Sequence, residues 1–334
     1  MHPLRDLIEL MDIVHPVTFT VTFLLASWLM IWRLEAMLDH GLEGTALGTL
    51  VVPYCSGLGN LVFVYLLWRD QGAPGEIVIN GLVNNVTNLT LLLGLPALIW
   101  PLQVLAKSNS KNKRTTAHTH RAQRLSRLSL SLTLVAVLFF TGVTWTLGRD
   151  GTLDRGDGFA LIALFLFWQC FQVYDVLKRN VQHDHRFGWW FYTDLVLIAL
   201  GGWVIFESLD AIVMILTTAS EGFFSASNLG WITGWLMVLP NALLAFYYAW
   251  RRRADIVYSS QIGDGHICIP LCIGLFAALR PVPLPPVFTT AIMILGGAVV
   301  VHLGCLLTIG RLPRWLGAVL IAAYGGFLYA GLIA

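Results

Sequence analysis

Long apolar stretches recur along almost the whole chain, and they constrain its fold more than any other feature. Crossing about 30 Å of hydrocarbon takes about 20 mostly apolar residues in a helix, and ten stretches of this kind are present. They lie near 16–38, 45–68, 75–105, 128–147, 158–178, 188–218, 227–250, 255–279, 287–309 and 313–334. Only 12% of the 334 residues are charged, against roughly 25% in soluble proteins. The sequence therefore predicts an all-α integral membrane protein of about ten transmembrane helices, surrounded by lipid bilayer.

Lysine and arginine alternate between the two sides of this predicted bundle. Cytoplasmic loops of membrane proteins carry the excess of these residues. Here the basic loops follow the third, fifth, seventh and ninth stretches, and the longest, Lys107–Arg127, is predicted to be a solvated loop. The opposite side holds Arg5, Arg69, Arg149, Arg155 and Arg280. We therefore expect a multi-pass protein of a bacterial-type inner or plasma membrane, with both termini on the non-cytoplasmic side.

Composition and motifs argue against several other classes of protein. The net charge of +2 is small, and the basic loop lacks the interleaved aromatic residues of a nucleic-acid surface. The five cysteines lie in apolar runs without a CxxC pair, which favours buried cysteines over a metal cluster. No phosphate-binding loop, GxSxG or HExxH motif is present. We expect neither enzyme activity, nor nucleic-acid binding, nor a cofactor other than a bound cation such as sodium.

Two segments of the chain resemble each other, which indicates an internal repeat. The segments are Leu82–Ile99 and Ile262–Leu279. Gly94 and Gly274 occupy the same place in each, and Asn60 and Asn241 precede them at nearly equal distances. Because the copies begin five spans apart, they face opposite ways across the membrane, as in transporters whose binding site lies at mid-membrane. The alternative is chance similarity between two apolar helix pairs.

The repeat also predicts how the chain is divided. The first five-helix repeat would span 1–178 with its core at 45–105, and the second 188–334 with its core at 227–279, joined by a cytoplasmic linker at 179–187. The third and sixth stretches exceed the length of one span, so they are expected to be tilted or broken.

Asp264 is the carboxylate that lies deepest in a predicted span. An ionisable residue in a membrane helix is a functional hypothesis by default, and Gly263 and Gly265 on either side allow the helix to loosen there. The alternative is a structural role in which Asp264 caps a broken helix. His266 should not share the face of Asp264 on an ideal helix, and a structural histidine bonded to a neighbouring helix is the simpler interpretation.

Two further carboxylates stand where predicted spans begin. Glu76 and Asp255 each open a span in corresponding parts of the two copies. A negative charge is favoured at the N-terminus of a helix by the helix dipole. We therefore expect both side chains to cap their own helices.

Amide and small side chains follow a similar order in both copies. The first copy contains Asn80, Asn84, Asn85 and Asn88, and the second contains Gly263, Asp264 and Cys268. Upstream, Asn60 follows Gly59 and Asn241 follows Pro240. These runs resemble the α-repeats of the cation/calcium exchanger superfamily. In that family a Pro-Glu pair on one helix precedes a Gly-Asn-x-x-Gly-Ser-Asn-x-x-Asn/Asp run on the next.

The match to that family is clearer in the first copy. Asn80, Asn85 and Asn88 fall on its three asparagine positions, and Asn84 takes the serine position. In the second copy Gly263 keeps a glycine, Asp264 replaces the serine, Cys268 replaces the last polar residue, and Pro240 keeps the proline. Glu207 resembles the acid on the preceding helix. The resemblance implies two inverted five-helix repeats around one ion site, opened to each side in turn as flanking helices slide.

The departures from the family are chemically important. Both Pro-Glu glutamates, its main ion ligands, are asparagines here. The ion ligands implied by the resemblance are Ser56, Asn60, Asn84, Asn88, Asn241 and Asp264, with Asn85, Glu207, His266 and Cys268 in access or supporting roles. One carboxylate does not suit calcium, which takes six to eight oxygens, several of them anionic.

Two functions remain open on these grounds. The first is an antiporter that moves a monovalent cation or a proton, with Asp264 as the charge carrier. The second is an exchanger-like chain that has lost transport and serves as a structural or accessory subunit of a larger membrane complex. A hydrated cavity that reaches Asp264 would favour the first function, and a dry, packed centre the second.

Overall fold

The computed structural model describes residues 15–39, 54, 57–104, 113–180, 189–219 and 222–333. Its longer elements in chain order are α2 (Pro16–Asp39), α5 (Leu58–Arg69), α6 (Gly75–Val86), α7 (Leu92–Ile99), α8 (Lys113–Leu147), α9 (Arg155–Asn180), α10 (Trp189–Thr218), α11 (Leu229–Trp250), α12 (Ala254–Gly263), α14 (Gly274–Leu279), α15 (Phe288–Thr308) and α16 (Arg314–Leu332). Nine apolar segments in this part of the chain are long enough to span a membrane, and α5 is a shorter apolar helix. The protein is thus an all-helical membrane bundle, as the hydropathy predicts.

One expectation about the loops was wrong. The basic segment Lys107–Arg127 is not a loop throughout, because α8 begins at Lys113 and runs on as one helix into the apolar part of the chain. Lysine, arginine, glutamine and leucine are good helix formers. A span can therefore continue beyond the bilayer as a solvated helix.

Two broken spans form the centre of the bundle. Gly75–Ile99 and Ala254–Leu279 are the most buried candidate spans. In their apolar 18-residue stretches, 78% and 83% of the residues are buried inside the protein. Each contains a widened π-helical turn at a corresponding place, Thr87–Leu91 in one and Cys268–Ile273 in the other. Such turns often occur at functional sites. The repeat seen in the sequence is thus repeated in the backbone.

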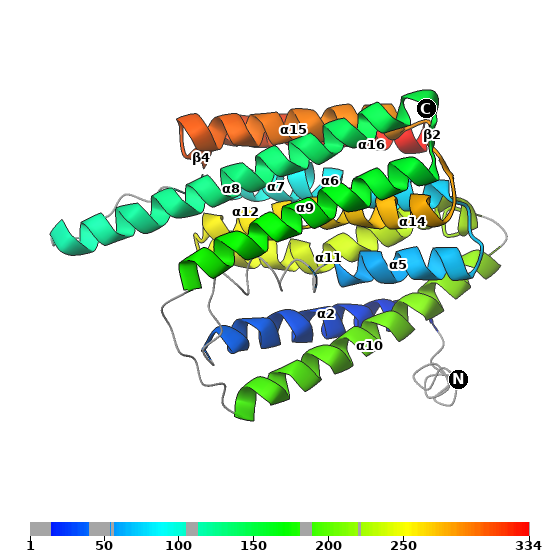
Figure 1. Cartoon of the computed structure of the whole chain (residues 1–334), viewed down its shortest axis with the longest axis horizontal. Helices are drawn as coiled ribbons and strands as arrows, with labels where there is room; N and C mark the ends of the chain where they lie inside the picture. Colours follow the sequence, from blue (N-terminus) through cyan, green and yellow to red (C-terminus); the bar gives the residue numbers. More distant parts are fainter. Residues whose placement is uncertain are drawn as a thin grey trace.

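The short strands follow the same pseudo-symmetry. β1 (Leu102–Gln103) leaves the first central span and pairs with β4 (Arg311–Leu312), while β3 (Val282–Pro283) leaves the second and pairs with β2 (Thr152–Leu153). The two strand pairs lie at opposite ends of the bundle (Figure 1). Each therefore ties the end of one central span to the other half of the chain.

The repeated glycines mark close helix crossings. A Cβ atom on Gly94 would lie 2.8 Å from the carbonyl oxygen of Gly317 on α16. In the second copy, a Cβ on Gly274 would lie 3.1 Å from the carbonyl oxygen of Gly158 on α9. Small residues allow helix backbones to approach closely in membranes. This contact explains the shared glycine without any role in binding.

α2 and α10 form a pair along one edge of the bundle. They pack side by side. α10 is inclined to the core, so its first residues lie far from the core helices, while its last turns approach α5 (Figure 1). Arg33 of α2 and Asp194 of α10 form an ion pair at 3.4 Å. The chain therefore has a central core and a flanking two-helix unit.

Candidate functional site

Asp264 lies at an interruption of the second central span. α12 ends at Gly263, and the single turn α13 (Gly265–Ile267) follows. The Asp264 side chain makes no capping hydrogen bond to this turn, although its carbonyl oxygen accepts the Cys268 backbone N–H at 2.8 Å. Asp264 thus stands at the N-cap position without a side-chain capping hydrogen bond, and its carboxylate makes contacts with other helices instead.

Asparagine side chains from both copies converge on this carboxylate. Asp264 Oδ2 accepts hydrogen bonds from Asn241 Nδ2 at 2.5 Å and from Asn88 Nδ2 at 3.3 Å. Asn88 Nδ2 also donates to Asn84 Oδ1 at 2.9 Å, and Asn84 Nδ2 donates to Asn60 Oδ1 at 3.4 Å. We call these five residues the central network. It joins α5 and α6 to α11 and the break after α12.

The central network is closed to solvent. Asp264, Asn60, Asn84 and Asn88 are 0% exposed, and Asn241 is 1% exposed. An isolated charge in such a place is costly, and the two amide donors lower that cost through charge-assisted hydrogen bonds. The buried carboxylate is thus held by neutral dipoles from both halves of the chain.

Some polar atoms near the carboxylate have no hydrogen-bond partner among the described residues. They include Asn88 Oδ1, Asn60 Nδ2 and Gln261 Oε1. Gln261 belongs to the same neighbourhood, because its Nε2 donates to the Asn241 backbone carbonyl at 3.1 Å. Amide oxygens are ligands for hard cations. A cation beside Asp264 would therefore find a spare acceptor on Asn88, and rotation of the amides would present more oxygens.

Gln261 and Thr233 were not singled out from the sequence. Asn80 Nδ2 donates to Thr233 Oγ1 at 3.0 Å, which links α6 to α11 next to the central network. Polar residues inside apolar spans were the signal that could have found Gln261 and Thr233. Neither falls on a position of the family motif, so the resemblance gave no reason to select them.

The predicted supporting residues take different places. Asn85 turns back to its own helix and donates to the Gly81 carbonyl at 2.7 Å. Cys268 is buried at the start of the π-helical turn, and Glu207 is buried on α10. Ser56 lies outside the described residues.

His266 does not behave as expected. Both of its ring nitrogens are buried without a hydrogen-bond partner in the described structure, so it is not a histidine bonded to a neighbouring helix. The centroid of its ring lies 6.4 Å from the ring centroid of Trp168. His302, by contrast, does contact a neighbouring helix, because its Nε2 lies 2.8 Å from the Leu89 carbonyl oxygen.

Glu76 was expected to cap its own helix, and this was wrong. Its Oε2 accepts the backbone N–H of Gly230, the second residue of α11, at 2.5 Å. The carboxylate therefore stabilises the N-terminus of a different helix, which the dipole argument allows but cannot assign. Asp255 pairs with Arg253 at 3.2 Å instead.

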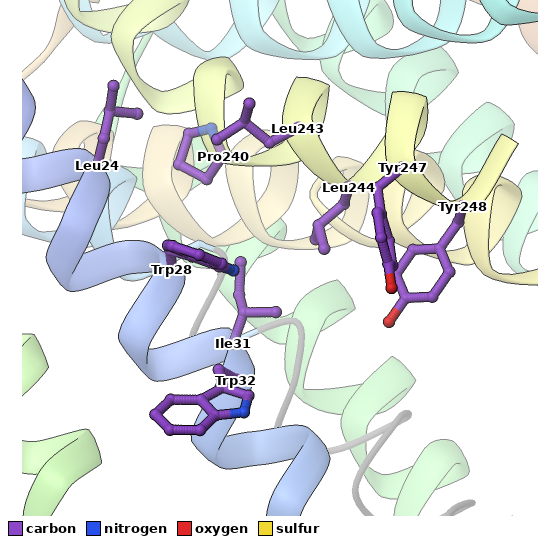
Figure 2. A pocket seen from close by; sticks show the side chains of 9 residues that line it. All are labelled: Leu24, Trp28, Ile31, Trp32, Pro240, Leu243, Leu244, Tyr247 and Tyr248. Atoms are coloured by element: carbon purple, nitrogen blue, oxygen red, sulfur yellow. The ribbon is translucent and has the colours of Figure 1, made fainter. Parts of the chain in front are cut away.

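An apolar groove between the flanking unit and the core leads toward the central network. It has a volume of about 520 Å³ and lies between α2 and α11, which diverge toward Trp32 and Tyr248 (Figure 2). A small cavity of about 10 Å³, roughly the space for one water molecule, adjoins it and is lined by Gly59 and Pro240. These residues directly precede Asn60 and Asn241. The small cavity thus borders the residues that precede two members of the central network in sequence.

Comparisons with known proteins agree with this architecture. Residues 13–174 match the sequence profile of the family described as sodium/calcium exchanger protein. Structures of the sodium-calcium exchanger NCX_Mj share the fold. One soaked with 10 mM Na⁺ and no Ca²⁺ has a TM-score of 0.67 at 18% identity and covers 95% of this chain and 98% of its own. One soaked with neither ion has a TM-score of 0.63 at 17% identity, covering 92% and 96%. None of the curated proteins matches the chain in sequence.

Proposed function

We propose that this chain, whose residues 13–174 match the sodium/calcium exchanger family and whose fold is that of NCX_Mj, is a cation antiporter that moves a monovalent cation or a proton rather than calcium. Asp264 carries the charge that binds the cation. Asn60, Asn84, Asn88 and Asn241 surround it with amide groups. No chemical catalysis is involved.

One observation carries this proposal. The single carboxylate of the central network receives amide groups from both copies of the repeat, Asn88 from the first and Asn241 from the second. Partners from two halves that face opposite ways suit a site that both sides of the membrane must reach.

The charge of the site supports a monovalent substrate. The central network holds one carboxylate, so a bound monovalent cation or proton would leave it neutral. A dication would retain about one positive charge in a medium of low polarity, which is expensive. Neutral amide oxygens would complete the shell of the cation without changing this balance.

The flanking unit supplies a route for alternating access. A groove already separates α2 from α11 and reaches Gly59 and Pro240 beside the site. Movement of α2 and α10 against the core would close this groove and open the other side. The binding residues themselves need move little, because they lie on the packed central helices.

The test is cation flux into liposomes, with sodium, potassium and proton gradients applied separately. Asp264→Asn should abolish flux, because the amide group of asparagine has no charge to neutralise the cation. The variant should still fold. Flux of sodium or potassium in the unaltered protein should fall as the pH drops, because protonation of Asp264 removes the same charge. Asp255→Asn, in an exposed ion pair, is the matched control and should retain flux.

A second function is favoured by the closed centre. The five residues of the central network are buried and bonded to one another, as in a dry scaffold that binds no ion. In that case the chain would be an accessory subunit of a larger membrane complex. Absence of flux for every cation tested, together with co-purification of a stoichiometric membrane partner, would move the assignment to this function.

A further inference from the structure

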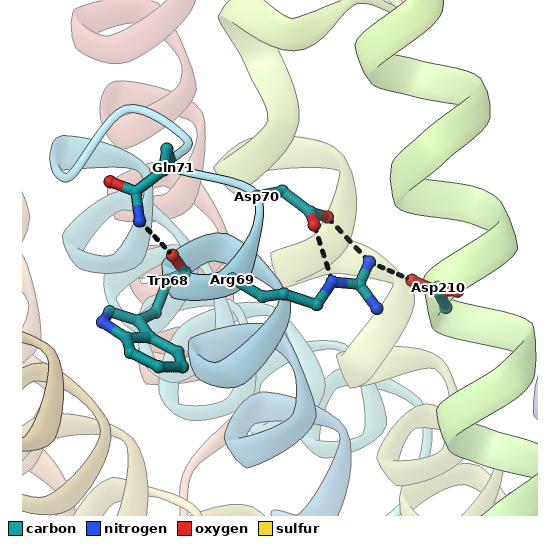
Figure 3. Close-up of polar contacts among 5 residues, drawn as sticks. All are labelled: Trp68, Arg69, Asp70, Gln71 and Asp210. Carbon is teal, nitrogen blue, oxygen red and sulfur yellow. Dashed lines mark hydrogen bonds and ion pairs between the residues drawn. The ribbon is translucent and has the colours of Figure 1, made fainter.

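Arg69 stands between two carboxylates at the end of α5. Its Nε and one terminal nitrogen donate to the two oxygens of Asp70 at 2.6 and 2.9 Å, and the same terminal nitrogen donates to Asp210 Oδ1 at 2.5 Å (Figure 3). Asp70 follows Arg69 in sequence, whereas Asp210 lies on α10. The guanidinium therefore connects the core to the flanking unit.

The position of this contact along α10 is informative. Asp194, paired with Arg33, lies near the start of α10, and Asp210 lies roughly 24 Å further along at 1.5 Å per residue. The groove widens at the Arg33 end, where Trp32 and Tyr248 line it. α10 approaches the core at the Asp210 end (Figure 1). The flanking unit is thus open at one end and joined to the core at the other.

We propose that the Arg69–Asp210 ion pair is a latch that holds one side of the protein closed while the groove on the other side is open. The Asp210 side chain is 12% exposed and that of Arg69 33%, so the pair is half-buried and solvent screens it only in part. Arg69 is the positioning residue on the core and Asp210 its counterpart on the flanking unit. Neither belongs to the central network.

Asp70 makes this latch reversible. Separating a buried ion pair is costly chiefly because it leaves a charge without a partner. Arg69 keeps its two-point contact with Asp70 when α10 moves away, because both residues belong to the same helix end. The positive charge is therefore never left alone, and the latch can open without that cost on its own side.

This inference rests on the proposed alternating access, but its test needs no substrate. Spin labels would be placed on Trp68→Cys and Thr217→Cys at the latched end, and on Trp32→Cys and Trp250→Cys at the open end, with Cys55 and Cys170 replaced by Ser. Double electron–electron resonance would measure the distance between the two labels at each end. In Asp210→Asn the latched-end distance should lengthen by about 5 Å, the size of a one-turn helix shift, and the open-end distance should shorten.

Controls separate a latch from a general loss of charge. Asp70→Asn should leave the latched end closed, because Arg69 then pairs with Asp210 alone. The exchanged pair, Arg69→Asp with Asp210→Arg, should restore the original distances, and it carries the test if Asp210→Asn does not fold. Unchanged distances in Asp210→Asn, or a lengthened latched end in the exchanged pair, would overturn the proposal.

Flux measurements keep the two proposals apart. Asp264→Asn should stop flux yet preserve the response of both distances to Asp210→Asn. If the unaltered protein moves no cation but the distances still respond, the latch stands and the antiporter assignment fails. If flux is present and the distances do not respond, the latch fails alone.

Discussion

At the residue scale, Asn60 and Asn241 stand where the resemblance to the exchanger superfamily implies acidic ligands. Asn60 and Asn241 join the central network, but only Asp264 brings a negative charge to it. Asparagine keeps a polar group for hydrogen bonding, but it is one methylene shorter than glutamate and carries no charge. The ion preference of the proposed site should therefore follow mainly from the lost charge.

Calcium transport is therefore expected to be absent. An outward sodium gradient should not drive calcium uptake into liposomes at micromolar calcium, because one carboxylate and neutral amides satisfy a dication poorly. Isotope uptake measures this, with a monovalent-cation flux in the same liposomes as the control. Calcium uptake that disappears in Asn60→Ala would contradict the prediction and restore calcium as a substrate.

At the scale of elements, the two central spans depend on matched irregularities. The π-helical turns at Thr87–Leu91 and Cys268–Ile273 and the crossings at Gly94 and Gly274 recur in both halves. The π-helical turns shift the side chains that follow, and the glycines bring neighbouring backbones close. The central helices are thereby fixed, while α2 and α10 remain a separate unit.

Gly94→Ala should destabilise the protein, although alanine is the better helix former by about 1 kcal/mol. The added Cβ would lie 2.8 Å from the Gly317 carbonyl oxygen, and backbone cannot yield as a flexible side chain can. Overpacking of this kind costs about 1–3 kcal/mol. Thermal unfolding in detergent measures the change. Gly297→Ala, whose Cβ would meet nothing within 4 Å, is the matched control and should be neutral or stabilising.

At the scale of the molecule, the fold of NCX_Mj is kept across 94% of this chain at 17% identity. At that identity most side chains differ, while the paths of the helices are kept. If the proposed function holds, the choice of ion should depend on the few polar side chains of the central network.

Orientation in the membrane remains a prediction from the basic loops. We expect both termini on the non-cytoplasmic side, with Asp150 outside and the turn at Arg252 inside. An impermeant thiol reagent applied to intact cells should label Asp150→Cys at once, but Arg252→Cys only after the membrane is made permeable. The reverse pattern would invert the topology and, with it, the side on which the groove opens.

The sequence alone determined the membrane class, the spans and the repeat, because a helix in lipid must be apolar along its whole length. Together with the resemblance to the exchanger superfamily, it also selected Asn60, Asn84, Asn88, Asn241 and Asp264. It could not show that Asn241 and Asn88 meet at one oxygen of Asp264, that Glu76 caps α11, or that Arg69 reaches α10. Those contacts join residues far apart in the chain. Hydropathy indicates which segments can lie in the membrane, whereas only the packed structure decides which faces of two helices meet.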